Sequence, residues 1–144
     1  MVPAIQTIVD GLQFGPTASD IWLWLVRLCA AYLVGLGMVV FWRRSLALRF
    51  LGGFAATLRA NTLESVLRFA AGIAFLGASP AMRTPGFFVV FGTVLAVSAL
   101  GMLLLPGAHK RYASWAVPLA QRIATLLGTV SIILGLVIGW ATLR

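Results

Sequence analysis

Acidic residues are scarce in this chain. Its 144 residues include three Asp or Glu against eleven Lys or Arg, and the formal net charge is +8. The acids are widely separated, at Asp10, Asp20 and Glu64. Active sites built on paired carboxylates, and calcium or magnesium sites, both need such groups close together. The sequence therefore predicts neither kind of site.

Cysteine and histidine each occur once. Cys29 has no partner for an intrachain disulfide, and in its apolar segment we interpret it as a small buried hydrophobe. His109 is able to supply one axial ligand to a haem or a chlorophyll magnesium, but there is no second histidine and its loop is basic and interfacial. We expect it to face lipid headgroups, and we expect no catalytic residue, no metal and no cofactor. The predicted class is non-enzymatic.

Charge of either sign is rare, because only 10% of the residues are charged while 61% are hydrophobic. The mean hydropathy is +1.03. A run of about 20 apolar residues crosses a bilayer core of about 30 Å, so the chain has room for about four spans and no second domain. In a soluble protein the positive charge would suggest nucleic acid. Here the basic residues flank apolar runs, so anionic lipid headgroups are the expected partner and nucleic acid is not.

We predict an all-α polytopic membrane protein, with residues 1–144 forming one four-helix transmembrane domain. The expected spans are residues 21–42, 63–79, 86–105 and 122–142, arranged as two hairpins. Residues 43–62 and 106–121 are the expected basic loops between the spans, the first of them broken at Gly52 and Gly53. Short interfacial helices are expected outside the spans, along the headgroups. Residues 1–20 lack the positive start of a cleavable signal and are expected to form an interfacial segment that turns at Gly15 and Pro16.

The basic residues lie mainly on one side of these expected spans. That side receives Arg43, Arg44, Arg49, Arg59, Arg68, Lys110, Arg111 and Arg122. The other side receives Arg83, Arg144, Asp10 and Asp20. The positive-inside rule then places the basic loops in the cytoplasm and both termini outside the inner (plasma) membrane of a bacterium. Arg43, Arg44, Lys110 and Arg111 are the expected contacts with anionic headgroups or partners.

Two charged sites fall within or beside the spans. Arg27 lies six residues into the first span, and no acid within the spans stands ready to pair with it. It therefore either snorkels to the headgroups or contacts a lipid or another subunit. Glu64 precedes Arg68 by four residues, the spacing of an ion pair on one helix face. This pair is either an interfacial salt bridge or part of a proton or ion path.

Small residues recur at intervals of four in every span, which lets helix backbones approach closely. Packing within the bundle is the ordinary explanation. Each of the four expected helices has one such row of small residues along a face. With four rows on only four helices, we expect one row, formed by Gly135 and Gly139, to face another protein.

The two halves of the chain echo each other weakly. Residues 36–38 and 100–102 both read Leu-Gly-Met before a basic stretch, and Arg68 and Arg122 then open the next spans. Duplication and chance explain this echo about equally well. In each half, a span is followed by a basic stretch and then by a second span that begins with an arginine. This order resembles small uncharacterised bacterial inner-membrane proteins built from helical hairpins, most closely over residues 86–139. The resemblance implies a bacterial membrane origin.

These features predict an accessory or structural subunit that packs against a larger inner-membrane assembly, such as an energy-transducing or transport complex. The alternative is a small homo-oligomeric transporter or channel for a lipid, a hydrophobic compound or an ion. Polar residues are rare at the span centres, and the main ones are Thr93, Ser98, Thr125, Thr129 and Ser131.

Overall fold

The computed structural model describes residues 15–54 and 57–143. This part of the chain is all-helical, as predicted. Its elements are α2 (Gly15–Trp42), α3 (Arg44–Phe54), α4 (Leu58–Ala78), η1 (Ser79–Ala81), α5 (Pro85–Leu104), α6 (Pro106–Arg122) and α7 (Ala124–Ala141). Four segments are long and apolar enough to cross a membrane: Ser19–Trp42, Leu58–Ala81, Pro85–Leu104 and Ala124–Ala141.

The starts of the first two spans differ from the sequence prediction. Gly15 and Pro16 begin α2 and do not form a turn before it, because the fixed φ of proline suits the first turn of a helix. The rest of the predicted interfacial segment, residues 1–14, lies outside the described residues. The second span begins at Leu58, where the Thr57 side chain accepts a hydrogen bond from the Ala60 amide at 3.1 Å and caps the helix.

Each of the two predicted basic loops contains a helix, α3 in the first and α6 in the second, in agreement with the short helices expected between the spans. Their position in a membrane interface stays a prediction. Pro106 follows the end of α5 and begins α6, since a helix tolerates proline in its first turn. Gly52 and Gly53 do not break α3, although each glycine costs a helix about 1 kcal/mol. Burial of Ala47 against α2 and α7 offsets part of that cost.

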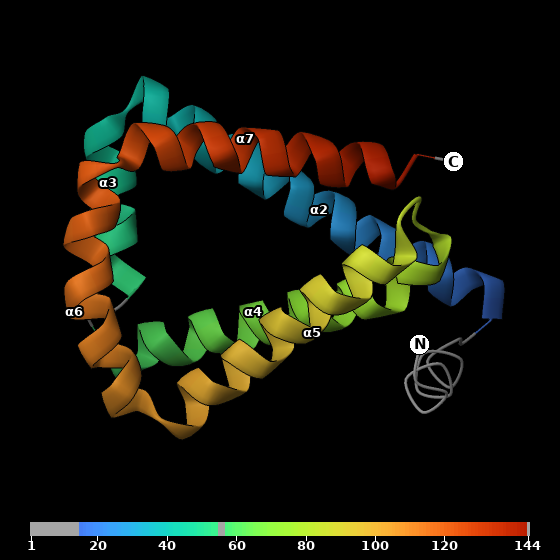
Figure 1. Cartoon of the computed structure of the whole chain (residues 1–144), viewed down its shortest axis with the longest axis horizontal. Helices are drawn as coiled ribbons and strands as arrows, with labels where there is room; N and C mark the ends of the chain where they lie inside the picture. Colours follow the sequence, from blue (N-terminus) through green and yellow to red (C-terminus); the bar gives the residue numbers. More distant parts are fainter. Residues whose placement is uncertain (1–14, 55–56, 144) are drawn as a thin grey trace.

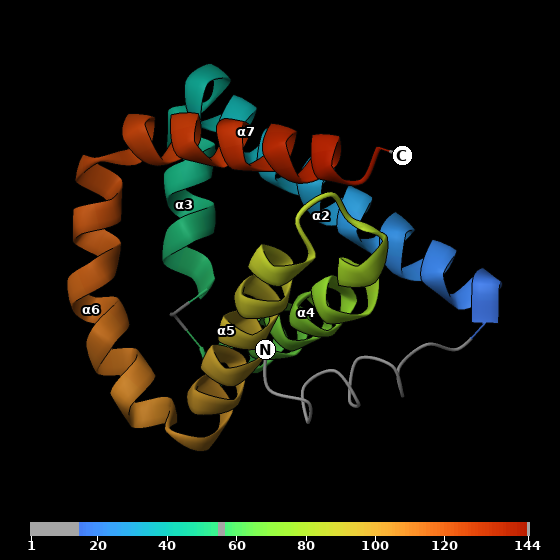
Figure 2. The same ribbon diagram turned by 45° about the vertical axis from the view of Figure 1, so that its right-hand side comes forward.

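The four apolar helices form two pairs that meet at one end and separate at the other (Figure 1, Figure 2). α2 packs along α7 and α4 packs along α5, while α2 makes a smaller contact with α4. The predicted hairpins, which pair the first span with the second and the third with the fourth, are therefore not what the closest contacts show. We call the converging end, where α7 finishes, the narrow end. The opposite end, crossed by α3 and α6, is the wide end.

Each half of the chain has the same order of elements. One half runs α2, α3, α4 and the other runs α5, α6, α7, each as span, crossing helix and span. The first span of each half packs on the last span of the other. The residues behind the sequence echo do not occupy matching places, because Gly37 is buried and Gly101 exposed, and Arg68 lies within α4 whereas Arg122 ends α6.

Glycines set the distance between the helices in both pairs. A methyl group built on Gly72 of α4 would lie 2.8 Å from the Gly92 backbone oxygen of α5. In the other pair, a methyl group on Gly37 would lie 2.5 Å from the Gly128 oxygen, and one on Gly135 would lie 2.7 Å from the Ala30 oxygen. Close backbone approach of this kind drives helix association in lipid, where apolar side chains gain little by leaving their surroundings.

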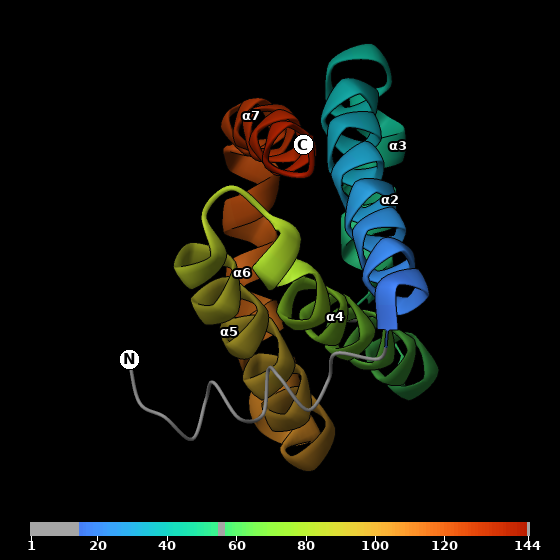
Figure 3. The same cartoon turned by 90° about the vertical axis from the view of Figure 1, so that its right-hand side faces the viewer.

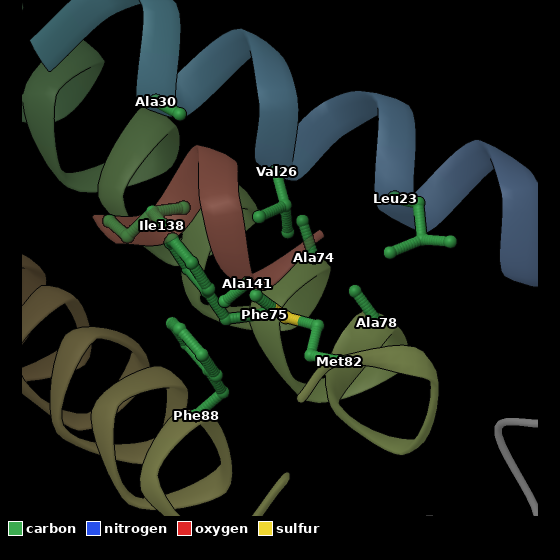
Figure 4. Packing of buried hydrophobic residues seen from close by; sticks show 10 residues of the cluster. All are labelled: Leu23, Val26, Ala30, Ala74, Phe75, Ala78, Met82, Phe88, Ile138 and Ala141. Atoms are coloured by element: carbon green, nitrogen blue, oxygen red, sulfur yellow. The ribbon is translucent and has the colours of Figure 1, made fainter. Parts of the chain in front are cut away.

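The main core lies at the narrow end and draws on all four apolar helices (Figure 3, Figure 4). The Phe75 ring stacks on Phe88 at 5.8 Å between centroids and meets the edge of Phe91 at 5.0 Å. Val26 and Ile138 come from the other pair and are almost fully buried in the same cluster. The narrow end is thus held by side-chain packing between the two pairs.

Replacing Gly92 with leucine should lower the thermal stability of the detergent-solubilised chain. The new side chain would collide with the Gly72 oxygen at 2.8 Å and the Leu76 amide at 3.1 Å, and overpacking of this kind costs about 1–3 kcal/mol. Gly101→Leu on the same helix is the control, because nothing lies within 4 Å of a methyl group there. Equal unfolding temperatures for the two variants, measured by circular dichroism, would contradict the packing argument.

Candidate functional site

A pocket of about 450 Å³ lies at the wide end, where α3, α4, α5 and α6 meet. It has charged and polar groups as well as apolar lining. The lining residues are Leu51, Glu64, Arg68, Ser98, Met102, His109, Tyr112, Ala113, Ala116 and Val117. Ligand sites for small molecules have volumes of about 300–1,000 Å³ and a few polar groups on an apolar surface.

One face of α6 supplies half of this lining. His109, Tyr112, Ala113, Ala116 and Val117 follow the i, i+3, i+4, i+7, i+8 spacing of a single helix face. The opposite face carries exposed residues, among them Lys110, Arg111, Ser114 and Trp115. The sequence contained this signal, but the prediction did not identify which face of this segment lines a pocket.

Glu64 and Arg68 form the ion pair that their spacing predicts. The Arg68 Nη2 atom lies 2.7 Å from the Glu64 Oε1 atom. The Glu64 side chain is 20% exposed and the Arg68 side chain 37% exposed, so the acid is the more enclosed member. An exposed i, i+4 pair stabilises a helix by only about 0.3–0.5 kcal/mol. This pair is of interest for its position on the pocket wall more than for its contribution to stability.

His109 has polar neighbours that the sequence did not reveal. Glu64, Arg68, Ser98 and Tyr112 line the same pocket, although no acid or serine could be placed beside His109 from sequence. Nucleophilic catalysis needs a base within hydrogen-bond reach of the nucleophile. Within the described residues no hydrogen bond joins the His109 side chain to Ser98, whose hydroxyl donates to the Leu95 carbonyl at 2.9 Å.

Arg27 has partners inside the chain, at the narrow end. Its Nη2 atom donates to the Thr142 carbonyl at 3.1 Å, and its Nε atom donates to the Thr142 hydroxyl at 3.3 Å. Its guanidinium also lies over the Trp24 ring, 5.2 Å from the centroid. The carbonyls at a helix C-terminus lack partners and carry partial negative charge, so a cation there is favourable. Arg27 thus has internal partners that the sequence did not predict, although they are a carbonyl and a hydroxyl and not an acid.

Arg83 binds the same helix end and was not singled out from the sequence. Its backbone amide donates to the Ala141 carbonyl at 3.2 Å, and its Nε atom donates to the Leu143 carbonyl at 3.1 Å. Its guanidinium lies 4.9 Å from the centroid of the Trp140 ring. Because Arg83 lies in the connection between α4 and α5, these contacts join the two helix pairs. Nothing in the sequence marks a backbone carbonyl as the acceptor for a distant arginine.

The other predicted contact residues lie on two surfaces. Gly135 is buried against α2, whereas a methyl group on Gly139 would meet nothing within 4 Å. Both line a groove of about 490 Å³ between α2 and α7, together with Arg27. At the wide end Arg43, Arg44, Lys110 and Arg111 are exposed, and Arg44 donates to the Gln121 carbonyl at 3.5 Å. Contact of these residues with a lipid or a partner stays a prediction.

Serine and threonine side chains mostly bond their own helices. Thr93 donates to Val89 and Thr129 donates to Thr125, each four residues earlier. Ser131 is different, because its hydroxyl donates to the Leu33 carbonyl at 2.7 Å and links α7 to α2. These hydroxyl groups therefore form hydrogen bonds within a helix or, for Ser131, between two packed helices.

Arg27→Met should loosen the last turn of α7. The substitution keeps an apolar side chain of similar length but removes both donors to Thr142, and hydrogen bonds to charged groups are worth about 1.5–3 kcal/mol. Amide hydrogen exchange at residues 139–143 should therefore quicken about tenfold or more. Arg49→Met, which removes an exposed arginine on α3, should leave those amides unchanged. Unaltered exchange in Arg27→Met would rule out the capping role.

The described residues thus contain a polar pocket at the wide end and a pair of arginines that caps a helix at the narrow end. In residues 15–54 and 57–143, no three His, Cys, Asp or Glu residues come together as a possible metal site. Comparison with protein-family models, with curated proteins and with solved structures finds no match to this chain.

Proposed function

We propose that this chain is a non-enzymatic protein of a bacterial inner membrane that carries an amphiphile, a molecule with a charged head and an apolar tail. This corresponds to the transporter class of function, with a lipid or similar hydrophobic compound as its cargo. The observation that supports it best is the wide-end pocket. Glu64, Arg68 and His109 line it together with Met102 and Val117, so it offers contacts to both parts of such a molecule.

The distribution of charge supports a cytoplasmic wide end. The residues of α3 and α6 include Arg44, Arg49, Lys110, Arg111 and Arg122, all exposed, and both helices cross that end of the spans (Figure 1). Cytoplasmic segments beside membrane spans are enriched in Lys and Arg. In this orientation the narrow end, with the start of α2 and the end of α7, faces the periplasm.

The crossing helices support an entry route from the cytoplasmic leaflet. α6 carries apolar residues on one side and most of its charged residues on the other, as helices that lie in a membrane interface do. Leu51 of α3 and Val117 of α6 both line the pocket. A lipid whose head lies at the depth of these helices would have its charged group beside the pocket.

The accessory-subunit hypothesis stays a prediction with less support. Arg27 does not require a partner subunit, since Thr142 binds its guanidinium, and Gly135 packs within the chain. The groove between α2 and α7, in which Gly139 is open, is the remaining feature in favour of a neighbouring protein. A large co-purifying assembly would restore this hypothesis.

Filling the pocket should release the amphiphile. The full chain would be extracted from its membrane in a mild detergent, and bound lipid would be measured by native mass spectrometry. Ala116→Trp places a large side chain in the pocket and should remove most of the bound lipid, because Ala116 is part of the lining. Ser114→Trp, on the exposed face of the same helix, is the matched control and should retain it. Equal retention by both variants would overturn the proposed function.

A further inference from the structure

Among the described residues, Glu64 is the one acidic residue at the wide end, and it lines the pocket. The described acids are Asp20, near the start of α2 at the narrow end, and Glu64. Glu64 is bound to Arg68 at 2.7 Å, and the exposed cations of α3 and α6 lie at the same end. The surroundings of the pocket are therefore strongly positive, which favours an anionic ligand over a cationic one.

Arg68 retains donors for a second anion. A guanidinium has five N–H donors in a planar fork, and the contact with Glu64 uses the Nη2 atom. The side chain is 37% exposed while lining the pocket, so a ligand can reach it. Two oxygens of one phosphate can accept parallel hydrogen bonds from two N–H groups of a guanidinium, which makes arginine a preferred phosphate ligand.

We propose that the pocket binds the phosphate of an anionic phospholipid through Arg68, and that Glu64 holds this anion site until the phosphate displaces it. This inference rests on the proposed function and names its substrate class. The phosphate replaces one oxyanion by another on the same guanidinium, so Arg68 is paired in both states. The apolar lining, including Met102, Ala116 and Val117, contacts the part of the lipid next to its head. Glu64 thus acts as an internal competitor of the ligand.

Opposite effects of the two charge substitutions test this proposal. Phosphatidylglycerol and phosphatidylcholine would each be titrated into the delipidated full chain in detergent, with binding followed by native mass spectrometry. The unmodified chain should prefer phosphatidylglycerol. Glu64→Gln should bind it about three- to tenfold more tightly, because the competitor is removed, and Arg68→Gln should bind it about tenfold or more weakly. The double variant should be as weak as Arg68→Gln.

Matched controls separate local from overall charge. Asp20→Asn changes the net charge as Glu64→Gln does but lies near the narrow end, and Arg49→Gln removes an exposed cation outside the pocket lining. Both should leave the affinity for phosphatidylglycerol within about twofold of the unmodified chain, since exposed charges contribute little. A misfolded protein cannot explain tighter binding, so the Glu64→Gln result is informative even if Arg68→Gln is unstable.

Four results would overturn the inference. Weaker binding of phosphatidylglycerol by Glu64→Gln would make Glu64 a ligand contact, and unchanged binding by Arg68→Gln would exclude the guanidinium. Equal competition by glycerol phosphate, which has no acyl chains, would assign the site to a soluble phosphate ester. If both lipids bound equally and Ala116→Trp released both, the inferred preference for an anionic phospholipid would fail while the proposed function stood. Lipid retention by Ala116→Trp would instead remove the proposed function.

Discussion

Close contact between helix backbones is the interaction on which the rest of this structure depends. In lipid, apolar helices gain little by burying apolar side chains against each other, so they associate where small residues let the backbones touch. Gly72 meets Gly92 in one pair of spans, and Gly37 meets Gly128 in the other. Each pair is therefore held along its length by its own contacts. The two pairs are free to separate at the wide end because few such contacts join one pair to the other.

The narrow end stays closed because α7 ends beside the other spans. A helix that ends in apolar surroundings leaves carbonyls without hydrogen-bond partners, and each costs several kcal/mol in a membrane unless a donor reaches it. Arg27 comes from α2 and Arg83 from the connection between α4 and α5, so the donors belong to different pairs. Their charges also oppose the negative end of the helix. An arginine within an apolar run is thus explained by a helix end.

The sequence predicted what depends on composition and length. The apolar runs located four helices that can cross a membrane, with ends mostly within a few residues of those found. It failed where the outcome depends on distant parts of the chain. The pairing of α2 with α7 follows from contacts between glycines nearly a hundred residues apart, and no local pattern states which small residues meet.

The partner of Arg27 was missed because backbone carbonyls are present at every residue. The face of α6 that lines the pocket follows helical spacing, since residues 109, 112, 113, 116 and 117 share one side. The sequence does not state which other helices this face meets, so the pocket was not predicted.

The carboxylate of Glu64 stabilises the positive charge of Arg68 when no ligand occupies the pocket. A lone guanidinium on the wall of a largely apolar pocket is costly, because leaving water penalises its charge. Glu64 offsets that cost from one helical turn away, at 2.7 Å, and it holds the guanidinium toward the pocket. Exchange of this carboxylate for a ligand phosphate then changes the partner of Arg68 without creating an unpaired cation.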